Sequence, residues 1–124
     1  MKKIFLFILL SAAVMNLHAQ KATWKEMHSF HDVMSAVFHP SEDNNLRPLR
    51  DSAALLLTRA KEWKKSEVPQ GFNAELTGQV LKQLVADCEA VKKAVEKNKP
   101  DAELKPMIAK AHDTFHEIME KCRN

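Results

Sequence analysis

The sequence lacks the motifs that mark several common classes of enzyme. It contains no His-Glu-x-x-His motif, no glycine-rich phosphate loop and no nucleophile elbow. Tyrosine is absent and the only glycines are Gly71 and Gly78, whereas residues that favour helices, such as alanine, leucine and lysine, are common. We therefore expect an all-α protein that is not an enzyme.

The N-terminus carries the pattern of a targeting segment. Lys2 and Lys3 precede an apolar run at residues 4–15, which is too short to span a bilayer comfortably and lacks stop-transfer charges. A small residue, Ala19, precedes Gln20. These features predict a cleaved signal peptide at residues 1–19 and an exported, periplasmic protein at residues 20–124.

A large charge excess is missing from the mature chain. The full sequence has a formal net charge of +3, but without Lys2 and Lys3 it has 17 basic and 16 acidic residues. We therefore expect neither nucleic acid nor an anionic membrane as a partner. No cysteine follows the apolar run, which argues against a lipid anchor, and we expect no membrane insertion after cleavage. A periplasmic protein partner and the oligomeric state stay open.

Three turn clusters divide the mature chain, at residues 39–45, 66–71 and 98–101. They separate four segments, at about 22–38, 46–65, 73–97 and 101–122, in which apolar residues recur every three or four positions. We expect Asp101 to cap the fourth helix, and Pro106 to kink its first turn or move its start later. Four helices joined by short loops predict one antiparallel up-down-up-down four-helix bundle.

Two histidines on the last segment stand four residues apart. His112 and His116 therefore share a helix face, with Cβ atoms roughly 5–6 Å apart. If each loop reverses the chain, with a rise of about 1.5 Å per residue, His31 lies within about one turn of the height of His112, and His28 lies level with His116. Small residues at this height, such as Ala53, would leave space for a ligand.

These positions predict a transition-metal site. Two histidines fall short of the three or four ligands that a zinc-class ion expects. His31 supplies a third imidazole, and Cys88, Met27 or His28 could complete the shell. Mixed nitrogen and sulfur donors suit zinc or copper. The alternative is structural, because a single core-facing histidine is more often a packing residue, and methionines on apolar stripes are more often part of the core.

The two cysteines are not expected to pair, although exported proteins usually form disulfides. Cys88 is level with about His112, whereas Cys122 lies ten residues further along the last helix, about 15 Å away. A disulfide tolerates Cα separations only up to roughly 7 Å. Cys88 is then either a buried inert residue or a soft ligand, and Cys122 is a candidate for exposure and for cross-linking two copies.

The exported bundle, with Met27 near the start of the first helix and Phe115-His116 in the last, resembles the cytochrome b562 group. That family is periplasmic, binds one b-type haem without covalent attachment and is thought to carry electrons. The resemblance implies Met27 and His116 as the axial ligands of a haem b. His116 lies farther from the C-terminus than that ligand usually does, and the chain contains potential ligands that a haem bundle does not need.

Other ligand-binding bundles are excluded by absent residues. No Cys-x-x-Cys-His sequence is present for covalent haem attachment, no Glu-x-x-His motif for a di-iron centre, and too few cysteines for copper storage. Three hypotheses remain. The first is a metal-binding protein with zinc or copper, the second is a haem b electron carrier, and the third is a partner-binding bundle without a cofactor.

Overall fold

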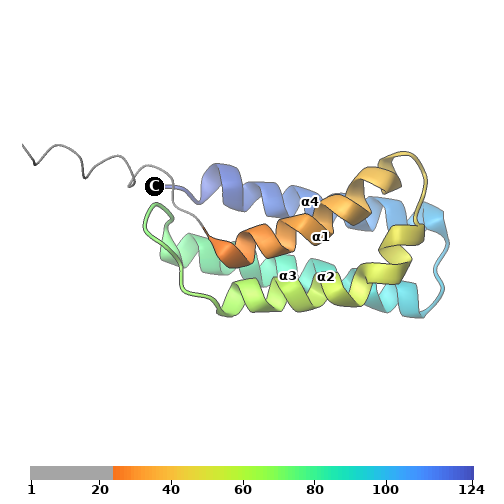
Figure 1. The fold of residues 1–124 in the computed structure, drawn as a ribbon, viewed down its shortest axis with the longest axis horizontal. Helices are drawn as coiled ribbons and strands as arrows, with labels where there is room; N and C mark the ends of the chain where they lie inside the picture. The colour runs from red at the N-terminus through yellow and green to blue at the C-terminus, as the bar shows by residue number, and fades with distance from the viewer. Residues whose placement is uncertain (1–23) are drawn as a thin grey trace, which may run out of the picture.

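The computed structural model describes residues 24–124, which form four α-helices. The predicted signal peptide lies outside these residues. The helices are α1 (Lys25–Glu42), α2 (Arg47–Lys65), α3 (Ala74–Glu96) and α4 (Asp101–Lys121). Each helix packs against the next, and α1 packs against α4, which closes an up-down-up-down bundle around one core (Figure 1). The predicted fold class is confirmed. Among the described residues, no helix is long and apolar enough to cross a membrane.

Two asparagines end helices in the same way. Asn44 and Asn98, which follow the C-caps of α1 and α3, adopt left-handed φ angles of 63° and 55°. The next amide in each case bonds a carbonyl in the last helical turn, Asn45 to Pro40 at 2.9 Å and Lys99 to Ala94 at 3.0 Å. This is the Schellman arrangement, in which asparagine can replace the usual glycine. The turns before α2 and α4 therefore form without glycine.

Two helices have a proline beyond their first turn, Pro40 in α1 and Pro106 in α4, and each proline bears on a predicted helix boundary. We expected α1 to end near residue 38, but it continues through Pro40 to Glu42. Pro40 removes only its own amide donor, while its carbonyl still accepts bonds from Asp43 and Asn45. In α4 the helix begins at Asp101, so Pro106 does not move its start later. The prediction that Asp101 caps this helix is wrong by one residue, because Pro100 is the N-cap and no side chain bonds the free amides there.

The C-terminus is tied to the loop between α2 and α3. The Asn73 amide donates to the Cys122 carbonyl at 2.7 Å, and the Asn124 amide donates to the Gly71 carbonyl at 2.9 Å. Cys122 is 0% exposed. The suggestion that Cys122 is exposed and able to cross-link two copies is therefore wrong, because its side chain is buried where the chain end is bonded to this loop.

A chain of aromatic side chains fills the core beneath α1 and α4. The ring centroids of Trp24 and Trp63 lie 5.6 Å apart, and those of Trp63 and Phe30 lie 5.4 Å apart. Phe115 on α4 touches both Phe30 and Trp63, at 5.7 and 5.8 Å. Phe115 is therefore held firmly in place, and the residues next to it on α4 are positioned with it.

Candidate functional site

A groove of about 360 Å³ lies between α1 and α4. These two helices make the smallest contact of the four neighbouring pairs in the described bundle, which leaves room at their seam. The groove is lined by two methionines, three histidines and one phenylalanine, namely Met27, His28, His31, Phe115, His116 and Met119. Most of the lining is apolar. The groove thus combines carbon walls with imidazole nitrogens and thioether sulfurs that can act as donors to a ligand.

Helical spacing explains why these side chains meet. Met27 and His31 are four residues apart on α1, and His116 and Met119 are three residues apart on α4, so each pair shares a helix face. Phe115 lies between the helices, and its ring stacks on that of His31 with centroids 5.5 Å apart. The groove agrees with the predicted level of His28 and His116, because both residues line it, and it also contains His31, which we expected within about one turn of His112.

The groove histidines are more exposed than the methionines. His28 and His31 are exposed, and 47% of the His116 side chain is accessible to solvent. Met27 is only 6% exposed. On the solvent side, Nδ1 of His116 lies 3.5 Å from a carboxylate oxygen of Glu120, which leaves Nε2 available to a ligand. Exposed rings turn at little cost, so the histidines can adjust to a ligand.

His112 does not line this groove. Its ring lies flat on Phe38, with centroids 3.7 Å apart and an interplanar angle of 6°, and its centroid is 4.5 Å from that of His116. Burial lowers the pKa of His112, and His116 lowers it further, while the charge of Asp113 acts in the opposite direction. A neutral imidazole is the form that coordinates a metal. His112 is therefore a neighbour of the groove, one helical turn from its edge.

The histidines of the described chain gather on two helices. His39 lies near the end of α1, outside the groove, with its Nδ1 3.4 Å from a carboxylate oxygen of Glu42. With it, all five histidines in residues 24–124 belong to α1 and α4, and α2 and α3 contain none. Imidazole chemistry in this part of the chain is thus confined to one side of the bundle.

Cys88 is placed in the core of α3, away from the groove residues. It is 0% exposed, and burial together with the charge of Asp87 raises its pKa to about 12. Metals bind the thiolate rather than the thiol, so a high pKa opposes ligation. Cys88 and Cys122 form no disulfide, which confirms the prediction that they do not pair.

The predicted metal ligands do not form a finished coordination site. Within residues 24–124, no group of three or more histidine, cysteine, aspartate or glutamate side chains is arranged to hold a metal ion. Zinc–nitrogen bonds are about 2.0–2.1 Å long, so three such donors must converge on one point. The structure instead brings His28, His31 and His116 to the walls of a shared groove, with His112 beside it and Cys88 elsewhere.

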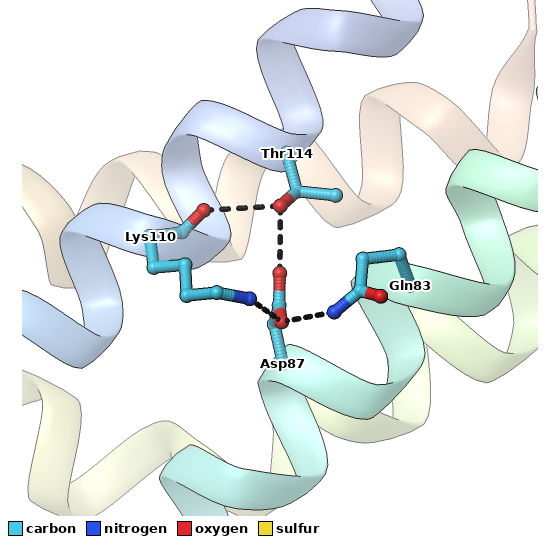
Figure 2. Close-up of polar contacts among 4 residues, drawn as sticks. All are labelled: Gln83, Asp87, Lys110 and Thr114. Carbon is cyan, nitrogen blue, oxygen red and sulfur yellow. Dashed lines mark hydrogen bonds and ion pairs between the residues drawn. The ribbon is translucent and has the colours of Figure 1, made fainter.

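Sequence reasoning missed a buried carboxylate that fixes α4 against α3. Asp87 is only 7% exposed, and it accepts hydrogen bonds from Thr114 at 2.6 Å, Lys110 at 2.5 Å and Gln83 at 2.8 Å (Figure 2). An aspartate three residues after Leu84, within the apolar stripe of its helix, was the available signal. Thr114 directly precedes Phe115 and His116, so this network also positions the α4 wall of the groove.

Comparison with known proteins gives no family assignment. No family model matches the chain, and no curated protein or solved structure matches it significantly. The resemblance to the cytochrome b562 group therefore extends to the four-helix all-α architecture, and the chemistry of the groove has to be argued from this chain's own residues.

Proposed function

We propose that this chain is an exported, non-enzymatic four-helix bundle that binds a transition-metal ion, zinc or copper, in the groove between α1 and α4. The observation that carries the proposal is the convergence of His28, His31 and His116 on one groove from two helices. Imidazole is a preferred ligand of both metals. Because these rings are exposed, rotation of their side chains can bring the nitrogens to bonding distance without repacking the core.

The neighbours of the groove support the same function. His112 lies beside His116, and burial lowers the pKa of His112, which favours its neutral imidazole, so it can serve as a further donor at the groove's edge. Glu120 lies against the outer nitrogen of His116, where a carboxylate commonly orients a metal-binding imidazole. Cys88 is the member of the predicted set that we leave out of the proposal, because its thiol is buried elsewhere with a raised pKa.

A haem b electron carrier is the second candidate, and the apolar lining of the groove favours it. A haem is a flat and largely apolar group, and carbon walls suit it better than they suit a bare ion. Met27 and His116 line the groove from opposite helices, so they could supply the two axial ligands. In this case the imidazoles of His28 and His31 would not be ligands of the haem iron.

Metal and haem content after purification separate these candidates. The protein is purified without chelator from a host that exports it and makes haem, its zinc and copper are measured by mass spectrometry, and a Soret band is sought in its spectrum. We expect bound zinc or copper in the wild type and its loss in a His31→Ala, His116→Ala double variant. His39→Ala is the matched control, because it removes an exposed histidine of α1 outside the groove.

Each result has a distinct meaning. Metal that stays bound in the double variant overturns the proposed site. A Soret band that disappears in His116→Ala establishes the haem alternative instead. Protein that contains neither metal nor haem, and whose thermal stability ignores added zinc, copper and haem, leaves a partner-binding bundle without a cofactor as the function.

A further inference from the structure

Two thioethers face the same groove from opposite helices. Met27 precedes His31 by one turn on α1, and Met119 follows His116 by one turn on α4. Because the two helices are antiparallel, α1 begins at the end of the bundle where α4 ends, and both methionines lie toward that end (Figure 1). On each helix, therefore, a thioether lies nearer this end of the bundle, and an imidazole of the groove, His31 or His116, lies one turn further in.

Methionine changes which metal the groove prefers. Thioether sulfur is a soft, uncharged ligand that selects cuprous copper, whereas zinc in proteins is bound by thiolates, imidazoles and carboxylates. The groove lining contains thioethers and imidazoles but neither a carboxylate nor a thiol. Leucine would fill an apolar groove equally well by volume, so methionine on both walls adds a donor atom that packing alone does not require.

Charge leads to the same metal. The side chains that line the groove are neutral apart from any protonated histidine, so they provide no negative charge to balance a divalent cation. The cost of moving an ion out of water into an apolar site rises with the square of its charge, so a monovalent ion pays about a quarter of the cost of a divalent ion of equal size. A monovalent soft cation fits a carbon-lined groove of neutral donors best.

We infer that the groove is a cuprous copper site, with Met27 and Met119 as sulfur ligands and His31 and His116 as nitrogen ligands. This inference rests on the proposed function and narrows it from zinc or copper to Cu(I). Phe115, which lies against His31 and lines the groove, separates the metal from the core. His28 is exposed at the same groove and is not required by the four-ligand set.

Competition with a chromophoric Cu(I) chelator tests the inference. The wild-type protein, as purified and stripped of metal, is titrated without oxygen in the presence of a reductant, and its zinc affinity is measured separately with a zinc indicator. We expect a Met27→Leu, Met119→Leu double variant to bind Cu(I) at least 30-fold more weakly. This factor corresponds to a loss of roughly 1 kcal/mol of binding free energy for each of the two sulfur ligands. Its zinc affinity should change less than threefold. Met107→Leu, on α4 outside the groove, is the control.

A second measurement does not depend on a variant. X-ray absorption at the copper edge of the Cu(I)-loaded wild type should show sulfur as well as nitrogen neighbours, and the sulfur signal should persist in a Cys88→Ala, Cys122→Ala variant. Unchanged Cu(I) affinity in the methionine double variant, an equal loss of zinc and Cu(I), or copper with nitrogen and oxygen neighbours alone would each overturn the inference. Zinc binding at His31 and His116 without sulfur-dependent Cu(I) binding would leave the proposed function intact, whereas no metal binding at all would end both.

Discussion

Replacing Asp87 by alanine tests how strongly α4 is held against α3. The change removes three hydrogen bonds, one from the buried Thr114 hydroxyl and two from the largely exposed ends of Lys110 and Gln83. A hydrogen bond to a charged group contributes about 1.5–3 kcal/mol. The two exposed partners return to water and contribute about 0.5 kcal/mol each, since 62% of the Lys110 side chain is already accessible.

The expected loss in the free energy of unfolding is about 2–3 kcal/mol. For the bond from Thr114 we use the lower part of the range of about 1.5–3 kcal/mol. The Thr114 hydroxyl also lies 3.1 Å from the Lys110 carbonyl, so it can still donate a hydrogen bond to that carbonyl in the variant. With a urea slope of about 1.3 kcal/mol per molar, the midpoint of unfolding should fall by about 1.5–2.3 M. Equilibrium unfolding in urea, followed by circular dichroism at 222 nm, measures this shift.

Two further variants show whether the buried carboxylate is the cause. Asp113→Ala removes an exposed carboxylate of α4 for which no hydrogen bond is seen, and it should change the stability by less than 0.5 kcal/mol, as surface substitutions usually do. A paired Asp87→Leu, Thr114→Val variant should lose less stability than Asp87→Ala, because leucine fills the space that alanine leaves empty and the buried contact becomes apolar on both sides. A loss below about 0.5 kcal/mol in Asp87→Ala, or a paired variant that is less stable than the single one, would refute the reasoning.

The two cysteines give the remaining predictions. Because burial raises the pKa of Cys88 from 9.0 to about 12, the thiol favours the folded state fully below pH 9 and loses this contribution as the pH rises from 9 to 12. At pH 10 the wild type should have lost about 1 kcal/mol of stability that a Cys88→Ala variant does not lose. Urea unfolding at pH 8 and pH 10 measures this difference, and equal losses in the two proteins would show that the thiol does not ionise on unfolding. Both thiols should react with a disulfide reagent only when the protein opens locally or unfolds, because both are buried. Cys122 should react faster than Cys88, because it lies at the C-terminal end of α4. Immediate labelling of Cys122 in the native protein would contradict its burial.

The sequence alone was enough to predict the four helices and their order. Apolar residues at spacings of three and four define the buried faces, and the turn clusters separate them, so the bundle follows from local patterns. Boundaries were less secure where a proline lay inside a helix. Pro40 lacks an amide donor, but its carbonyl accepts hydrogen bonds from two amides of the turn that follows α1. Whether the helix continues past this proline therefore depends on the conformation of that turn.

The groove was only partly accessible from the sequence. Counting residues along antiparallel helices was enough to predict that His28 is level with His116 and that His31 lies within about one turn of His112, because rise per residue is constant in a helix. That count has no information on rotation about the helix axis, so it placed Cys88 and His112 in the same set, whereas one is buried in the core and the other stacks on Phe38.

What the amino-acid order determined by itself is therefore the class of fold, the heights of the side chains along it and the concentration of histidine on the first and last helices. The tertiary structure alone decided which faces meet. It placed Met119 opposite Met27, buried the side chain of Cys122 and gave Asp87 its partners on α4. The physical reason is that these features depend on the packing of side chains between helices distant in sequence, which no local periodicity specifies.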